Sequence, residues 1–499
     1  MKIQRIHIYM LASFTLLESC YKDNNNYVVD DINQANISIA ADSYAVMRLS
    51  ELSIVPDIIS SIHDNDSYTY EWKVFEPKER DDYTGRVSYS EILATAKDLK
   101  EIIYTPPGKY MLLYTVTNNT TGVKSFKTFS LIVNSGFYEG LVVGYQKDNH
   151  AELGFIRTDG VISYDLIQTL NGEALEGTLQ EMNTLIVKSL RRMAVTTSSN
   201  HYHIDMDGFK IMQDKTSLFS TSPMDFGRSF FGGNKMGRPY HAPSDIFYIN
   251  SGRLYADTGP DFVGSIGGMY SQAFYYSAGD YELYPFLFNG RSASIIYFYD
   301  NLNGKFLQSG FNKRTLTDVP FHATDKFDPS NVKKNAIAAM LGYNNNVYYV
   351  MQDGSNYYIY TMIQYNSYMA GDIQSVDLSN APELDQARIF DARSDQRYIY
   401  YAVKNKLYLY NLVANSARLV LTLSASEEIA DIHVYRSNMW QNTSEDDFNK
   451  RIYIASNRGE SGKVYQYGTL EDGSLLNRAE REFEGFGKIA DVDYRNVNE

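Results

Sequence analysis

The feature of this sequence that most limits its fold is a β-hairpin pattern that recurs through the last two thirds of the chain. Residues 397–412, RYIYYAVKNKLYLYNL, show it well, because two runs rich in Tyr, Ile, Val and Leu flank the turn Lys404-Asn405-Lys406. This arrangement predicts an antiparallel hairpin. Similar hairpins begin at spacings of 48 to 54 residues, near Leu141, Met193, Asp245, Ala293, Asn345, Gln396 and Lys450.

An all-β repeat of this period predicts a seven-bladed β-propeller over residues 136–499. An eight-bladed ring and two smaller β domains are the alternatives. Residues 428–434, EIADIHV, and 488–494, KIADVDY, are near copies, and 387–391, ARIFD, is a candidate third copy. We interpret this element as the innermost strand of a blade. The last copy has no hairpin after it, so the C-terminal strand is expected to complete the first blade and close the ring without an open sheet edge.

Residues 31–135 show short strand-like runs between turns, which is typical of a small antiparallel sandwich. The alternation of Tyr68, Tyr70 and Trp72 predicts that the Trp faces the core. Only residues 90–100, SEILATAKDLK, are predicted to be helical.

The composition agrees with an all-β protein, since 43 Tyr and 25 Phe are residue types that favour strands. A single Cys excludes a disulfide within the chain. The formal net charge of -14 argues against nucleic acid as a partner, because affinity for phosphates comes chiefly from clustered Lys and Arg.

The first twenty residues have the form of a secretory signal. Lys2 and Arg5 precede an apolar run over residues 6–17, which is too short to span a bilayer. The following Leu17-Glu18-Ser19-Cys20 resembles a bacterial lipobox, in which Cys20 is acylated and becomes the new N-terminus. An ordinary signal peptide with a chance Cys is the alternative. Residues 21–30 are polar and Asn-rich, and they are expected to form a flexible tether.

Three segments of the first domain carry a family resemblance. They are residues 70–74, YEWKV, residues 105–110, TPPGKY, and residues 114–118, YTVTN, with Gly122 after them. Together they resemble the PKD domain, an immunoglobulin-like sandwich. The Gly-Asp-Gly turn common in that family after the Trp strand is absent here, so ion binding is not carried over. With the lipobox, the chain resembles the PKD-like lipoproteins of Bacteroidetes, which are encoded beside TonB-dependent nutrient-uptake systems.

This resemblance implies a lipid-anchored protein of the outer membrane, exposed at the cell surface. Its propeller would be a non-catalytic accessory component that holds an oligosaccharide or a peptide beside a TonB-dependent transporter, and no cofactor is expected. The main alternative is a structural or adhesion role in which the propeller docks onto a partner protein. A propeller-type glycoside hydrolase or lyase is the second alternative.

Ligand-binding residues are expected in the segments that interrupt the repeat. Residues 225–243 and 259–274 are Gly-rich and flank the third hairpin, and residues 436–449 carry the second Trp. Long loops on a rigid scaffold often bind ligands, and aromatic faces beside an Arg suit sugars or peptides. The candidates are Arg228, Phe230, Phe231, Arg238, Tyr240, His241, Tyr270 and Trp440. The alternative is that Phe230 and Phe231 pack between blades.

Catalytic residues are not predicted, because the sequence has no nucleophile elbow, no Gly-rich phosphate loop and no HExxH motif. A carboxylate pair for glycoside hydrolysis cannot be chosen from sequence, since the reaction depends on the distance between the two groups. His201, His203 and Asp205 alternate along one predicted strand and would share one of its faces. They are a weak candidate for a metal site.

Overall fold

The computed structural model describes residues 32–62, 66–77, 89–187, 190–231, 246–257, 270, 272–289, 295–310, 313–364, 369–436 and 448–495. The chain divides into two compact units, each almost entirely β. The first unit holds the residues up to Ile103 together with Gly108–Asn134, and the second holds Tyr104–Pro107 and the residues from Ser135 onward.

The first unit contains a five-stranded sheet and two strand pairs. The order in the large sheet is β2 (Ser43–Met47), β9 (Lys124–Asn134), β8 (Gly108–Asn118), β5 (Tyr68–Phe75) and β6 (Ser90–Ala94). The pairs are β1 (Ala35–Ser38) with β4 (Asp57–Ser60) and β3 (Glu51–Ile54) with β7 (Leu99–Ile102). Trp72 is fully buried and stacks on Tyr114 with 4.1 Å between ring centroids. The alternation in β5 therefore places the Trp in the core, as the sequence predicts.

The helix predicted over residues 90–100 is wrong. These residues form β6 and β7, which are separated by a bend over residues 96–98. β6 pairs with β5, and β7 pairs with β3. The ladder hydrogen bonds of these pairings outweigh a helix propensity that is only a weak prior over so short a segment.

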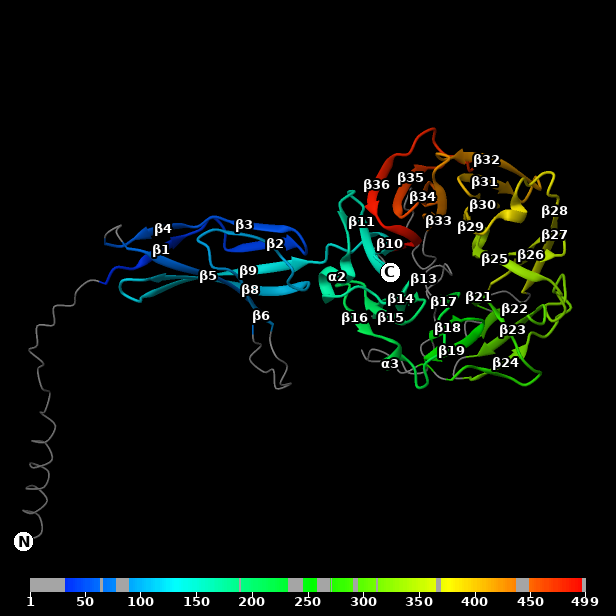
Figure 1. Cartoon of the computed structure of the whole chain (residues 1–499), viewed down its shortest axis with the longest axis horizontal. Helices are drawn as coiled ribbons and strands as arrows, with labels where there is room; N and C mark the ends of the chain where they lie inside the picture. Colours follow the sequence, from blue (N-terminus) through cyan, green and yellow to red (C-terminus); the bar gives the residue numbers. More distant parts are fainter. Residues whose placement is uncertain are drawn as a thin grey trace, which may run out of the picture. The chain divides into compact units, whose positions relative to one another are not determined.

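The second unit consists of sheets that follow one another along the chain (Figure 1). From the innermost strand outward, the first is β37 (Lys488–Arg495), β10 (Gly140–Lys147), β11 (His150–Arg157) and β12 (Ile162–Ser163). The second is β13 (Leu179–Val187), β14 (Leu190–Thr197), β15 (His201–Asp205) and β16 (Ile211–Gln213). The third is β17 (Ser229–Phe231), β18 (Ile246–Asn250) and β19 (Arg253–Asp257). The fourth is β21 (Leu283–Asn289), β22 (Ile295–Asp300), β23 (Lys305–Gly310), β24 (Thr315–Asp318) and β20 (Tyr275–Tyr276).

Three further sheets complete this series. The fifth is β25 (Asn335–Leu341), β26 (Val347–Asp353), β27 (Asn356–Met362) and β28 (Ala370–Val376). The sixth is β29 (Ile389–Ala392), β30 (Tyr398–Val403), β31 (Lys406–Asn411) and β32 (Ser416–Thr422). The seventh is β33 (Glu428–Val434), β34 (Arg451–Arg458), β35 (Ser461–Gly468) and β36 (Arg481–Phe486). The short helices of the described residues are α2 (Leu166–Asn171), α3 (Lys215–Leu218), η2 (Tyr343–Asn345) and η3 (Leu384–Gln386).

The innermost strands lie next to one another in a closed circle. Each contacts the next in the order β13, β17, β21, β25, β29, β33 and β37, and β37 contacts β13. β37 is the last strand of the chain and pairs antiparallel with β10, the first strand of this unit. The two ends of the unit are thus joined by backbone hydrogen bonds within one sheet. Seven sheets of the second unit occur among the described residues, and the blade count of the whole ring stays a prediction.

The Asp of the repeated element links neighbouring sheets. In each of three cases its carboxylate accepts a hydrogen bond from a backbone amide of the next innermost strand. The contacts are Asp391 to Val434 at 2.7 Å, Asp431 to Val492 at 2.9 Å and Asp491 to Met182 at 2.7 Å. The Asp is therefore repeated because it ties one sheet to the next.

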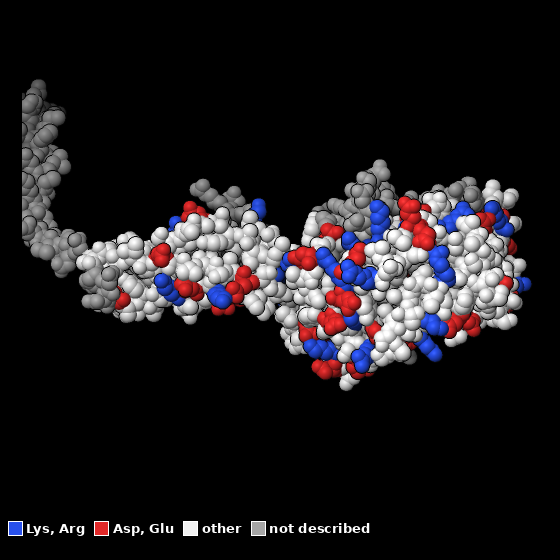
Figure 2. All heavy atoms as spheres, turned by 90° about the horizontal axis from the view of Figure 1, so that it is seen from above, with Lys and Arg blue, Asp and Glu red and all other residues white. Residues whose placement is uncertain are grey.

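Acidic and basic side chains are interspersed over the face of the molecule shown in Figure 2. Several exposed cations of the second unit form ion pairs with carboxylates. The pairs include Lys326–Asp372 at 2.6 Å, Lys406–Glu383 at 2.9 Å and Arg418–Asp472 at 3.0 Å. Such surface pairs contribute little to stability, but they neutralise the cation locally.

Candidate functional site

Two of the predicted ligand-binding aromatic residues are buried. Phe230 is 5% exposed and packs on Phe286 with 5.0 Å between ring centroids. Tyr270 is fully buried, and its ring lies 4.9 Å from that of Phe219. Neither ring presents a face to a ligand, so both predictions are corrected. The pattern of aromatic residues did not reveal which of them pack between the sheets.

The other predicted binding residues are only partly described. Arg228 donates a hydrogen bond to the Tyr284 hydroxyl at 2.8 Å, and its guanidinium lies over the Tyr284 ring. Phe231 lies in β17, opposite Tyr248. Arg238, Tyr240, His241, Trp440 and the predicted lipid-attachment residue Cys20 lie outside the described residues.

The weak metal candidate in β15 is a buried polar cluster. His201 and His203 are fully buried, and burial lowers the pKa of His201 to about 3. Burial also lowers the pKa of His203 well below its usual value. The His203 ring nitrogens lie 3.2 Å from Arg192 Nη1 and 3.1 Å from the Tyr270 hydroxyl.

A guanidinium at this distance would repel a metal cation, and both ring nitrogens of His203 already have partners. Asp205 accepts a hydrogen bond from the Gly208 amide at 2.6 Å. Within the described part of the chain, no group of three or more His, Cys, Asp or Glu side chains is arranged to hold a metal ion. The metal hypothesis for His201, His203 and Asp205 is therefore wrong.

An open pocket of about 510 Å³ lies where three connections of the second unit meet. One connection is η2, between β25 and β26; the second joins β29 to β30; the third is the turn between β31 and β32. The lining residues are Tyr343, Asp395, Gln396, Arg397, Tyr398, Asn411 and Val413. We call this the Arg397 pocket.

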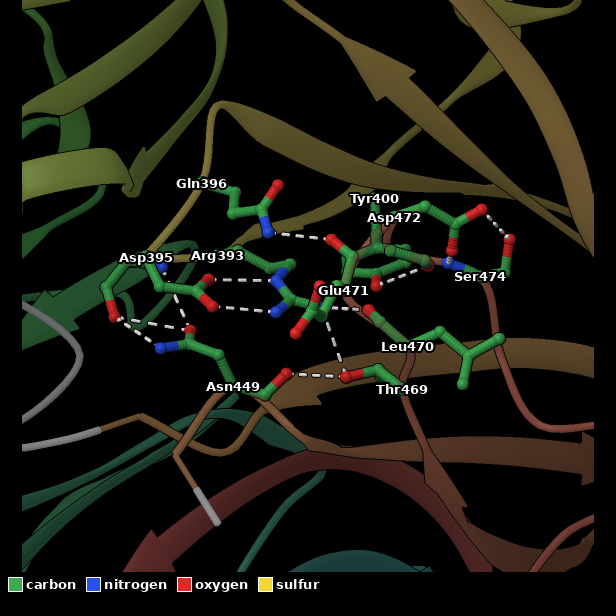
Figure 3. Close-up of polar contacts among 12 residues, drawn as sticks. Arg393, Asp395, Gln396, Tyr400, Asn449, Thr469, Leu470, Glu471, Asp472 and Ser474 are labelled. Carbon is green, nitrogen blue, oxygen red and sulfur yellow. Dashed lines mark hydrogen bonds and ion pairs between the residues drawn. The ribbon is translucent and has the colours of Figure 1, made fainter. Parts of the chain in front are cut away.

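Asp395 is held at the edge of this pocket by a buried Arg (Figure 3). Arg393 donates to the two Asp395 carboxylate oxygens from Nε at 2.9 Å and from Nη2 at 2.7 Å. The Arg393 side chain is 3% exposed, whereas that of Asp395 is 41% exposed. Burial would lower the pKa of Arg393, but the hydrogen bonds to Asp395 outweigh this effect and the pKa is raised. Arg393 therefore keeps its positive charge beside the Asp395 carboxylate, which remains partly open to solvent.

The neighbouring sheet fixes Arg393 in turn. Its Nη1 donates to the Thr469 hydroxyl at 3.2 Å and to the Leu470 carbonyl oxygen at 2.9 Å, both just after β35 (Figure 3). Gln396 also reaches this segment, because its Nε2 donates to the Glu471 carbonyl at 2.7 Å. The connection between β29 and β30 is thus anchored to the next sheet, which preorganises the pocket wall.

Several polar groups of the pocket retain unused hydrogen-bonding capacity. Gln396 uses its amide nitrogen, so its side-chain oxygen is left to accept. Asn411 Oδ1 accepts from the amides of Val413 and Ala414, which leaves its amide nitrogen to donate. Among the described residues, the Arg397 guanidinium forms no ion pair or hydrogen bond; it lies 5.5 Å from the Tyr343 ring centroid.

The pocket therefore combines donors, acceptors and aromatic rings. The two rings belong to Tyr343 and Tyr398, which are both half-buried. Planar amide, carboxylate and guanidinium groups bind pairs of hydroxyls, and aromatic faces pack on the C–H faces of sugar rings. An oligosaccharide fits this set of groups better than an apolar ligand does.

A second pocket of about 530 Å³ lies beside the hairpin turn that joins β34 to β35. Its Lys463 Nζ is paired with Glu482 at 2.6 Å and Glu484 at 2.9 Å. Glu427 Oε1 accepts from the Tyr465 hydroxyl at 2.7 Å and from Ser456 at 3.0 Å. Because these charged groups are already engaged within the protein, this pocket is the weaker candidate.

The Arg397 pocket lies outside the segments that break the repeat, so the sequence does not predict it. Arg397, Tyr398 and Asn411 belong to the hairpin of residues 397–412, which is a regular copy of the repeat. An available signal was the run Arg393-Ser394-Asp395-Gln396-Arg397, which places five polar residues before a strand.

Across the described residues, no helix has both the length and the apolar character needed to cross a membrane.

Comparisons with known proteins agree with this architecture. The model of the PKD-like family matches residues 20–178. None of the curated proteins compared with the chain matches it. A crystal structure of a quinonprotein alcohol dehydrogenase-like protein from Bacteroides thetaiotaomicron is similar at a TM-score of 0.50, with 13% sequence identity. That similarity covers 93% of this chain and 99% of the other.

Two weaker similarities are to extracellular and propeller domains. The β-propeller domain of Cps50 (Swd1) from Myceliophteria thermophila gives a TM-score of 0.36 at 10% identity, covering 64% of this chain and 92% of that one. The extracellular domain of a protein described as a one-component system from B. thetaiotaomicron gives 0.34 at 9% identity, covering 63% and 38%. The strand content, the family match and the similarity to the dehydrogenase-like structure show an almost entirely β protein with a PKD-like N-terminal domain and a propeller-like second unit.

Proposed function

We propose that this protein is a lipid-anchored protein of the outer cell surface whose propeller-like unit binds an oligosaccharide in the Arg397 pocket. It holds the ligand for an outer-membrane uptake system and catalyses no reaction on it. A TonB-dependent transporter of that system is its partner. The anchor is Cys20, and the PKD-like domain lies between this residue and the ligand-binding unit in the sequence. The lipobox-like run Leu17-Glu18-Ser19-Cys20 supports the anchored arrangement.

The observation that carries the ligand-binding function is the set of unused polar groups around Tyr343 and Tyr398. Asp395 is fixed by a buried ion pair, and Gln396 is fixed by a bond to the next sheet. A ligand therefore meets groups that are already oriented, so it loses less free energy to ordering them. In the weaker pocket, Lys463 and Glu427 are occupied by bonds within the protein.

Binding of the purified protein to a broad glycan array, with a peptide array beside it, tests this function. Tyr343→Ala should weaken binding to the glycan found by about tenfold, because truncation of an aromatic anchor typically costs more than about 1 kcal/mol. The matched control is Tyr275→Ala, which removes a Tyr that is 65% exposed on β20. The control should bind like the wild type.

Other outcomes would contradict the proposal. Binding of peptides alone would exclude an oligosaccharide as the ligand, and glycan turnover would exclude a non-catalytic role. Equal binding by Tyr343→Ala and the wild type would place the ligand outside the Arg397 pocket. For the anchor, the wild type should fractionate with membranes and Cys20→Ser should not; a soluble mature wild type would contradict lipidation.

A further inference from the structure

We infer that the Arg397 pocket selects an acidic oligosaccharide, in which the Arg397 guanidinium pairs with the carboxylate of a uronic acid. This inference rests on the proposed function and names the ligand class of that site. Arg397, Asp395 and Arg393 carry it, together with the charge of the whole chain.

The charge balance of the pocket is positive. Its lining contains one carboxylate, Asp395, and one cation, Arg397. The Asp395 carboxylate is already neutralised by the bidentate contact with the buried Arg393. Among the described residues, Arg397 is therefore a positive charge of the pocket lining with no carboxylate paired to it. A neutral ligand would leave the positive charge of Arg397 unpaired, whereas an anionic ligand would neutralise this charge.

The protein as a whole is acidic. The chain has 60 Asp and Glu against 46 Lys and Arg, and exposed cations such as Arg418 and Lys326 lie in ion pairs. Arg397 instead lies over the Tyr343 ring, with 5.5 Å between its central carbon and the ring centroid. Stacking on an aromatic ring restrains a guanidinium while leaving its N–H edges available to a ligand.

The geometry of a guanidinium suits a carboxylate. Its planar fork donates two parallel hydrogen bonds to the two oxygens, which a hydroxyl cannot match. The other polar groups of the pocket are neutral amides or an already paired carboxylate: Gln396 accepts, Asn411 donates and Asp395 accepts. These groups suit the hydroxyls of the same or the next sugar. One sugar acid can thus contact the cation while its ring lies near Tyr343 or Tyr398.

The test compares each acidic sugar with its own methyl ester. Oligomers of galacturonate, mannuronate and glucuronate are titrated into the purified protein by calorimetry at low and at high salt, each beside its methyl ester. Esterification keeps the ring and the hydroxyls and removes only the charge. We expect at least one acid to bind about tenfold or more tightly than its ester, and this preference to shrink at high salt.

Variants of Arg397 locate the effect. Arg397→Gln should abolish the preference for the acid while ester binding is retained, and Arg397→Lys should keep part of it. Arg478→Gln is the matched control, because Arg478 is exposed outside the pocket and its loss changes the net charge equally. It should leave the preference intact.

The possible results separate the two proposals. Equal binding of acids and esters that is lost in Tyr343→Ala would overturn the acidic ligand and leave the oligosaccharide-binding function standing. A preference for the acid that survives in Arg397→Gln, or that Arg478→Gln removes equally, would also overturn the inference. If none of the six probes binds but a neutral glycan of the array does, the acidic class is wrong. Failure of every glycan would overturn both proposals.

Discussion

At the residue scale, Glu152 shows how burial changes the pKa of a carboxylate side chain. It is 2% exposed in β11, and its carboxylate accepts from the backbone amides of Leu153, Ile167 and Gln168. Burial nevertheless raises the pKa of Glu152 to about 7. The folded state therefore holds this proton at pH values where the unfolded chain has released it. The stabilisation from Glu152 is complete below about pH 4.5 and is lost as the pH rises through about 7.

We predict that this residue makes the protein less stable at neutral than at acidic pH. Relative to Glu152→Gln, the free energy of unfolding of the wild type should fall by about 3 kcal/mol between pH 4 and pH 8. Calorimetric unfolding across this range measures the difference. Glu173→Gln, which changes a nearby exposed Glu, should follow the wild type. A parallel pH dependence in the wild type and Glu152→Gln would show that the carboxylate is not responsible.

Also at the residue scale, the sequence could predict which types of residue bind but not which of them are accessible. Phe230 and Tyr270 are aromatic residues near Gly-rich loops, which predicts a binding role, but both are buried. Tyr343 and Asn411 lie about seventy residues apart and meet only because neighbouring sheets bring their connections together. A contact of this kind leaves no local pattern in the sequence.

At the scale of the elements, the repeat predicts the strands because similar hairpins recur in the sheets of the second unit. The hairpins found by alternation correspond to the two middle strands of the sheets, such as β30 with β31 and β34 with β35. The near copy at residues 488–494 pairs with β10, as its position at the end of the repeat predicts. The role of its Asp in joining two sheets could not be predicted, because the acceptor and the amide are 309 residues apart.

We predict that this Asp stabilises the junction where the ends of the second unit meet. Asp491 is 5% exposed and accepts from the Met182 amide at 2.7 Å. Asp491→Ala would leave that buried amide without its acceptor, which should lower the free energy of unfolding by about 1 to 3 kcal/mol. Calorimetric or chemical unfolding measures the loss. Glu428→Ala, at an exposed position in another copy of the element, should leave stability unchanged; an equal loss there would contradict the assignment.

At the scale of the whole molecule, the scaffold and the site differ in how far the sequence determines them. Period, alternation and the Trp strand were enough to predict two all-β units. The site depends on Arg393, which crosses from one sheet to the segment after β35 and thereby fixes Asp395. Such an arrangement is a property of the assembled second unit, so it became visible only with the structure.

Hydrogen exchange measured on the protein with and without a glycan from the array tests the central claim most directly, because it locates the ligand on the chain. The Arg397 pocket predicts slower exchange around residue 343 and over residues 394–398 and 411–414. Protection at these segments should be much smaller in Tyr343→Ala than in the wild type at a ligand concentration near the wild-type Kd. Protection confined to residues 225–243 and 259–274, with no change near Arg397, would contradict the account.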